Sequence, residues 1–419
     1  MSGAADWLFA ILVLVLVVVV ARTGGWLAVR MRQPRIAGEL VGVMAIGPTV
    51  LGGQIEGVVA GAESSGAVGA LFAPVTMELL TWVGGLGLIL YMLLVGMTID
   101  ARPIARRWPL IGLIVVALLL VSVAVAMATG LWLAADDGWR ATDASVLAFV
   151  LGLSAAISAH GVPIVARILE ELALLRTELG MAVIAGGACI TTVALVMSGV
   201  AIKGGGAGTA AKLIPIPIAG ALLIAALAAL LQSARVRLHR QMRIAGLLAL
   251  AVGSGVLGKA LIGTALVGPL VVGVLVSSGG APASSIDARL GRIVRGALLP
   301  VFLGVAALHT NLREFGADDL LPVAVLIAVV VTAKAVAGYV AARAAGFDGV
   351  SSVAAGVLLQ CGGIMTIAIS LEQLHAGVIT TRTHAALTLI GLVSTVIVGP
   401  LLTRARLPRG TRAAAASVA

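Results

Sequence analysis

Two ionisable side chains lie deep inside long apolar stretches of the sequence, and they are the first candidates for chemistry. Lys334 lies in the middle of one stretch, and His160 lies in another, just before Gly161 and Pro163. Inside a membrane an ionisable group costs at least about 2.5–3.5 kcal/mol, so one that is retained there is expected to have a function. Histidine, with an unperturbed pKa of ~6.5, could take up and release a proton near neutral pH. We therefore expect His160 to carry a proton and Lys334 to act at the same site.

Each of these candidates also has a structural explanation. Lys334 could extend its amine to a membrane interface, and His160 could stay neutral and bond backbone carbonyls that are freed at a helix break. Thr191 and Thr192 could ligate Na⁺ or K⁺ weakly, because hard cations prefer oxygen ligands. The same two threonines could instead bond the carbonyls of their own helix.

Other polar residues occur in the same apolar stretches. Glu39 lies about one helical turn inside its stretch. It could be a charge of a cytoplasmic funnel on the ion pathway, although we favour a structural ion pair with Arg35. The hydroxyl and amide side chains that could line the same cavity are Ser154, Ser158, Gln360 and Thr366.

The sequence indicates no enzyme, cofactor or nucleic-acid site. It has no HExxH motif, and its two cysteines, Cys189 and Cys361, lie in apolar segments that suggest neither a disulfide nor a zinc site. The net charge is +10, but the arginines form short clusters between apolar runs and aromatic residues are only 3%. This pattern is not that of a nucleic-acid-binding protein.

The composition identifies the elements that must position the candidates. Of the 419 residues, 60% are hydrophobic and 11% are charged, whereas a soluble protein averages about 25% charged residues. Apolar runs such as 11–21 are apolar at every position, so the alternation of a transmembrane β-barrel is absent. The chain is therefore predicted to be an all-α polytopic membrane protein.

Thirteen membrane spans are predicted by length and hydropathy. They cover residues 6–21, 37–53, 78–99, 109–134, 145–168, 180–202, 213–232, 244–260, 261–279, 297–312, 320–342, 351–371 and 385–403. Glycine-rich sequence obscures the turn within 244–279. No connection is long enough for a soluble regulatory domain, so residues 1–419 are expected to form a single transmembrane transporter domain.

The basic residues predict the orientation of the spans. Alternate connections hold 21 Lys and Arg on one side and 5 on the other, with two more inside spans. Basic connections stay in the cytoplasm, so the N-terminus is expected outside and the C-terminus inside, in a multi-pass protein of the plasma membrane. The first run follows Asp6 and no basic segment, so it is expected to be a retained helix rather than a cleaved signal.

An internal repeat of inverted topology is also predicted, over about 37–202 and 261–403. Gly42-x4-Gly47-Pro48 recurs as Gly263-x4-Gly268-Pro269, and the helical patterns break at 160–163 and again near 361–363. The paired segments run in opposite directions across the membrane. Inverted repeats with a broken helix in each half are typical of secondary transporters, whose substrate site lies near the midplane where the breaks meet.

The chain carries a set of short motifs: Gln33–Leu40 with Gly47–Gly52, Leu94–Met97 with Asp100, Pro163–Glu171 with Leu174–Gly180, Leu299–Phe302, and Ala333-Lys334. In these motifs the sequence resembles the bacterial monovalent cation:proton antiporters of the Kef-like, cation:proton antiporter-2 group. The resemblance implies a sodium/proton antiporter-like fold, with a core of two crossed, unwound helices and a dimerisation domain. It also implies elevator-type alternating access and a homodimer. The lysine that matches Lys334 neutralises the ends of the broken half-helices or pairs with an acid.

The sequence departs from the family pattern at the ion site. The family carries an Asp in the middle of span six, where this chain has Cys189-Ile190-Thr191-Thr192. Gly362 and Thr366 stand where an Arg-Gly-x-x-Glu-like element is usual. Lys259 stands in place of a common Glu, so we expect it to line the cavity.

Three functions fit these observations. The first is exchange of Na⁺ or K⁺ for protons by a membrane-embedded homodimer. The second is export of another solute on the same fold, such as an organic ion or natural product, which two lysines without a core acid would favour. The third is a degenerate membrane scaffold that transports nothing.

Overall fold

The computed structural model describes residues 4–31, 33–50, 73–97, 108–136, 138–171, 174–175, 177–204, 208, 240–278 and 290–404. The regular secondary structure of this part of the chain is helical, apart from one isolated antiparallel bridge between Arg140 and Ile379. Apolar runs form helices in a membrane because a helix satisfies every backbone N–H and C=O within the segment. Nine of the described helical segments are long and apolar enough to cross a membrane.

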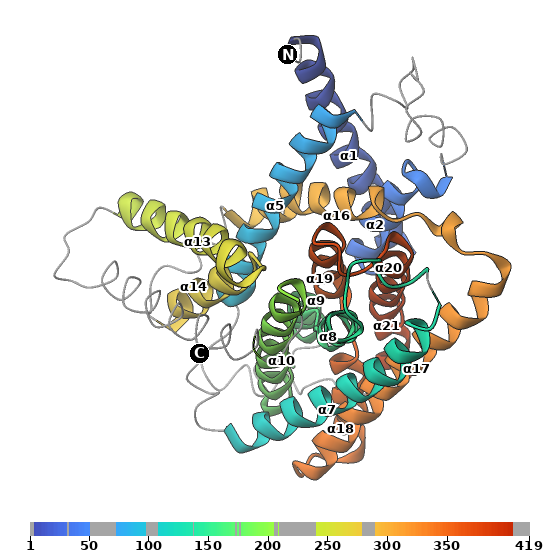
Figure 1. The fold of residues 1–419 in the computed structure, drawn as a ribbon. Helices are drawn as coiled ribbons and strands as arrows, with labels where there is room; N and C mark the ends of the chain where they lie inside the picture. Colours follow the sequence, from blue (N-terminus) through green and yellow to red (C-terminus); the bar gives the residue numbers. More distant parts are fainter. Residues whose placement is uncertain are drawn as a thin grey trace.

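The helices fall into two sets, and most helices that pack closely against each other belong to the same set (Figure 1). The first set comprises α1 (Ala4–Arg30), α2 (Arg35–Met44), α5 (Pro74–Met97), α13 (Arg240–Ile262), α14 (Val267–Ser278) and α16 (Leu299–Leu308), which continues a short π-helical turn (Val294–Leu298). The second set comprises α7 (Trp108–Leu133), α8 (Val146–Ser158), α9 (Val162–Glu171), α10 (Glu178–Ile202), α17 (Ala317–Ala344), α18 (Gly349–Leu359), α19 (Gly363–His375), α20 (Thr381–Val396) and α21 (Val398–Arg404). A 3₁₀ turn (Leu312–Glu314) leads from α16 towards α17.

Twelve of the thirteen predicted spans coincide with these helices, and the span at 213–232 lies outside the described residues. The predicted division at 260/261 is two residues early, because α13 continues to Ile262. The turn falls at Gly263, whose φ of +88° favours glycine. The predicted span at 37–53 begins in α2, which ends at Met44 before the Gly47-Pro48 pair.

Side chains cap four helices of the second set at their N-termini. Ser145, Thr177 and Thr380 each accept a hydrogen bond from a backbone N–H in the first turn of α8, α10 and α20. Asp348 caps α18 in the same way, and hydrogen bonds from Ser351 hold the pKa of its carboxyl below the ordinary value. These caps satisfy donors that a helix cannot satisfy itself.

Close packing within the first set depends on glycine. Gly96 of α5 faces the backbone of α14, so an added Cβ would overlap the Leu270 carbonyl and lie 2.8 Å from the Gly273 Cα. Small residues at such positions let helix backbones approach each other.

Replacing Gly96 with Val is therefore expected to lower the free energy of unfolding by about 1–3 kcal/mol, the usual cost of overpacking. Thermal unfolding of the detergent-solubilised protein would measure this. Gly85→Val is the matched control in the same helix, because no atom lies within 4 Å of a Cβ added there. Equal unfolding midpoints for the two variants would show that the close α5–α14 contact is not required.

Two helices of the second set are broken, and their breaks meet. The first break, Ala159–Gly161, separates α8 from α9, and the second, Gln360–Gly362, separates α18 from α19. The Gly161 N–H donates a hydrogen bond to the Cys361 carbonyl at 2.9 Å, which joins the two breaks. The structure thus has the two crossed, broken helices that the sequence predicts, while the bounds of the two repeats stay a prediction.

Candidate ion site at the crossing of two broken helices

Lys334 of α17 places its amine at the end of a broken helix. Its Nζ donates to the Ile157 carbonyl at 2.7 Å and to the Ala159 carbonyl at 3.0 Å, and the residue is 2% exposed. The last carbonyls of a helix lack intrahelical partners and carry the negative end of its dipole. The amine is therefore held at the crossing rather than extended to a membrane interface. This is the position that the family resemblance implies for the lysine.

His160 lies in the first break with one ring nitrogen bound and the other without a partner. Its Nδ1 lies 2.8 Å from the Ser158 carbonyl, and a carbonyl can only accept, so Nδ1 carries the hydrogen. In the neutral ring Nε2 then has a free lone pair, and this atom is buried with no hydrogen-bond partner among the described residues. The Leu359 carbonyl, at the end of α18, and Lys334 are close enough to interact electrostatically with the ring. A proton at Nε2 would thus have an oxygen acceptor nearby.

The two threonines of α10 differ in their relation to the crossing. The Thr191 hydroxyl accepts from the His160 N–H at 3.0 Å and donates to the Gly187 carbonyl at 2.7 Å. Thr192 donates to the Ala188 carbonyl at 2.9 Å. Both hydroxyls thus bond their own helix, but only Thr191 also contacts the break. The one carboxylate of α10 is Glu178, in its first turn.

Buried polar atoms without partners gather in the two breaks. The Ser158 hydroxyl, His160 Nε2 and the Gln360 carbonyl oxygen have no hydrogen-bond partner among the described residues, although the Gln360 amide donates to the Ser394 carbonyl at 2.8 Å. Such atoms are rare in folded proteins and often mark the place of a water or ion. Ser154, by contrast, bonds back to the Val150 carbonyl of its own helix. Thr366 is buried one turn beyond the second break.

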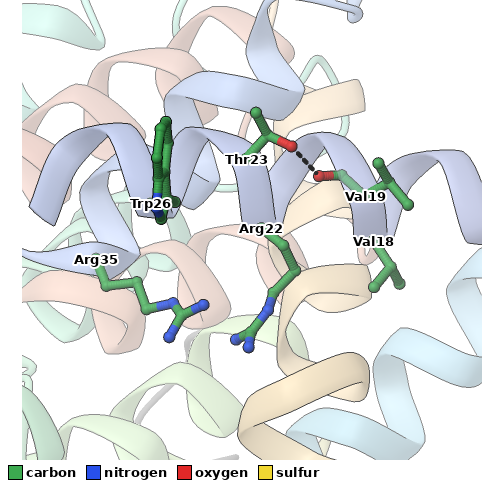
Figure 2. Close-up of a pocket in the computed structure, with 6 residues that line it drawn as sticks. All are labelled: Val18, Val19, Arg22, Thr23, Trp26 and Arg35. Atoms are coloured by element: carbon green, nitrogen blue, oxygen red, sulfur yellow. Dashed lines mark hydrogen bonds between the residues drawn. The ribbon is translucent and has the colours of Figure 1, made fainter. Parts of the chain in front are cut away.

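Glu39 belongs to the first helix set, away from the crossing. Its carboxylate is 2% exposed and pairs with Arg35 at 3.1 Å and with Arg22 at 3.6 Å. The two arginines line a groove of about 530 Å³ beside α1, together with Trp26 (Figure 2). The favoured structural pairing with Arg35 is therefore present.

The expectation that Lys259 lines the cavity is wrong. Lys259 lies exposed in the last turn of α13, where it interacts electrostatically with Glu372 and His375. At a helix end the long side chain can keep its ammonium in water. Lys334 is therefore the lysine placed at the crossing.

Sequence reasoning missed Glu372. The predicted span ended at residue 371, but α19 continues to His375 and carries Glu372 in its last turns. One carboxylate oxygen accepts from the Ala265 N–H of the first helix set at 3.1 Å, and the other is buried without a partner among the described residues. The absence of Gly and Pro between residues 364 and 376 was the available signal that the helix runs on.

Crossed, broken helices with a buried charge at the crossing are typical of secondary transporters. The family described as "Sodium/hydrogen exchanger, transmembrane" matches residues 10–406, so the chain belongs to this family. The family is one of membrane exchangers rather than enzymes.

Several curated relatives are distantly similar. Cation/H(+) antiporter 20 of Arabidopsis thaliana is 25% identical over 94% of this chain and 48% of its own length. K(+)/H(+) antiporter 1 of Saccharomyces cerevisiae is 25% identical over 88% of this chain and 43% of its own length. Na(+)/H(+) antiporter NhaS4 of Synechocystis is 23% identical over 93% of this chain and 95% of its own length. The chain thus spans less than half the length of the plant and yeast relatives.

A solved structure has the same fold. The sodium proton antiporter MjNhaP1 from Methanocaldococcus jannaschii superposes with a TM-score of 0.68 over 97% of this chain and 100% of its own, at 14% identity. The predicted sodium/proton antiporter-like fold is thereby confirmed. The narrower Kef-like assignment stays a prediction.

Proposed function

We propose that this protein exchanges a monovalent cation, Na⁺ or K⁺, for protons across the plasma membrane by alternating access. Family membership and fold support antiport, and the relatives' names include Na⁺, K⁺ and unspecified cations. The distribution of basic residues supports an outer N-terminus and a cytoplasmic C-terminus.

His160 is the proton-carrying group in this proposal. The observation that carries it is the buried, unpartnered Nε2 of a ring whose Nδ1 is fixed to the Ser158 carbonyl. Uptake of a proton at Nε2 turns an acceptor into a donor beside the carbonyl ends of α8 and α18. Lys334 stays bound to the α8 carbonyls and holds that end in place.

Competition between charges couples the two fluxes. A cation held by oxygens of the breaks and by Thr191 would lie within a few ångströms of the His160 ring. Two positive charges about 4 Å apart repel by about 4 kcal/mol at an effective dielectric constant of 20. That energy weakens the binding of either charge nearly a thousandfold when the other is present. A proton on His160 therefore excludes the cation, and the cation excludes the proton.

The two helix sets provide the moving parts of an elevator. Few close helix pairs join the sets, so the second set can slide against the first with little loss of packing. Large apolar side chains of α1, such as Leu8, Leu12 and Val19, are more than half exposed and fit membrane lipid or a second copy of the chain. A homodimer through the first set follows the family resemblance.

Export of another solute, such as an organic anion, is the second candidate. Lys334 supports it, because this buried cation bonds carbonyls while α10 offers no acid at mid-helix. Lys259, which would have made the site more cationic, lies elsewhere. One of the two features that favoured this function is thus lost.

Vesicles that contain the purified chain and hold a pH gradient test the proposal. Adding Na⁺ or K⁺ is expected to dissipate the gradient, while choline is not. Thr191→Asp, which places an acid in the middle of α10, serves as a control for an intact scaffold. A silent native chain with an active Thr191→Asp variant would show that the coupling group has been lost. Ion-independent solute efflux would favour the exporter. If neither the native chain nor Thr191→Asp transports any solute, the non-transporting scaffold is the remaining function.

A further inference from the structure

Two histidines face each other where the two helix sets meet. His309 ends α16 of the first set, and His375 ends α19 of the second set. Their Nε2 atoms lie 3.4 Å apart, and the rings are edge-on with centroids 5.0 Å apart. His309 is half-buried and His375 is exposed, so water reaches the pair.

The separation of the two nitrogens matches a metal site. Zn²⁺ binds imidazole nitrogen at about 2.0–2.1 Å in a tetrahedron, which places two ligand nitrogens about 3.3–3.4 Å apart. His309 is also oriented as a ligand, because its Nδ1 donates to the Val305 carbonyl at 2.8 Å and leaves Nε2 as an acceptor, which faces His375 Nε2. Metal-binding histidines are usually fixed in this way through their other nitrogen.

We propose that His309 and His375 together bind a divalent transition-metal ion, with Zn²⁺ as the best fit. The described residues contain no group of three or more His, Cys, Asp and Glu suited to a metal, so water completes the coordination. The exposed His375 ring must carry its hydrogen on Nδ1 to offer Nε2 to the metal, which its contact with solvent permits. Binding therefore needs no net loss of a proton.

The charges around the pair set the affinity. Lys259 of α13 lies near His375 and disfavours a cation, while Glu372 lies one turn earlier in α19 and is also near Lys259. His384 of α20 is close enough to interact with both histidines, but its Nδ1 is bound to Ser370. Because only two protein ligands are present, the site is expected to bind reversibly.

A metal ion in this place would join the two helix sets. Another contact crosses between the sets at the same end, because Glu372 accepts from the Ala265 N–H at 3.1 Å. Nearby, Thr381 of α20 donates to Glu314 of the 3₁₀ turn at 2.7 Å. Under the proposed topology this end faces outside. External metal would therefore hold the outer end closed and inhibit exchange, a consequence that rests on the proposed function, whereas binding itself does not.

Binding is tested on the purified full chain in detergent, by calorimetric titration and thermal unfolding with Zn²⁺ and Ni²⁺. The native chain is expected to bind one ion and to unfold at a higher temperature. His309→Ala and His375→Ala are each expected to weaken binding at least about tenfold, since even the loss of an outer-shell partner costs about 10–100-fold. Thr381→Ala removes the nearby hydrogen bond to Glu314 without removing a ligand and should bind as the native chain does. Equal affinity in all four proteins would overturn the site.

Inhibition is tested in vesicles with Zn²⁺ on one side at a time. Zn²⁺ on the outer side is expected to stop exchange by the native chain and to leave His309→Ala active. Binding without inhibition would overturn the clamp between the sets. A chain that binds Zn²⁺ but exchanges nothing without it would contradict the proposed function and leave the metal site standing.

Discussion

The variant His160→Gln is expected to lose cation-dependent proton movement and to remain folded. Glutamine can still donate to the Ser158 carbonyl, which the native Nδ1 reaches at 2.8 Å, but it cannot take up a proton near neutral pH. In vesicles, the rate at which Na⁺ or K⁺ dissipates a pH gradient should fall to that of protein-free vesicles.

The matched control is His384→Gln. His384 is also buried, but it lies in α20 with its Nδ1 bound to Ser370 and is not part of either break. This variant should keep the native response. If His160→Gln keeps it as well, another group carries the proton, and the next candidates are Lys334 and Glu372.

The variant Lys334→Met is expected to cause the largest loss of stability. It removes the donor to two buried carbonyls, those of Ile157 and Ala159. Each buried acceptor left without a partner costs about 1–3 kcal/mol, so the two together predict a loss of about 2–6 kcal/mol in the free energy of unfolding. The measurement is thermal unfolding in detergent.

Lys203→Met provides the comparison for that loss. Lys203 also donates to a carbonyl, that of Ala260 at 3.3 Å, but at an exposed position. Surface changes of this kind usually stay within about 0.5 kcal/mol. Similar unfolding midpoints for Lys334→Met and the native chain would mean that the amine does not stabilise the broken helix.

The fold was predictable because the apolar runs and the breaks are local signals. Gly161 and Pro163 mark the first break, and Gly362 with Gly363 marks the second, within a residue or two of where the structure has them. The division between α13 and α14 was predicted less accurately, because several glycines in this stretch could form a turn and the sequence does not single out Gly263.

The site was predictable only in part. A lysine in the middle of an apolar run needs polar partners for its buried amine, and few positions offer them. Lys334 finds them at the crossing, as the family resemblance implies. Lys259 looked equivalent in sequence but lies in the last turn of α13, where its long side chain can keep the ammonium in water. His309 and His375 are 66 positions apart in sequence, and no local pattern predicts their contact.

Proton release on cation binding tests the central claim most directly. The detergent-solubilised chain is placed in weak buffer with a pH indicator, and Na⁺ or K⁺ is added near the pH at which half of His160 is protonated. If the cation and the His160 proton exclude each other, the native chain releases protons in proportion to cation bound, while His160→Gln binds the cation and releases none. Equal release from both proteins, or cation binding without any release from the native chain, would contradict the account.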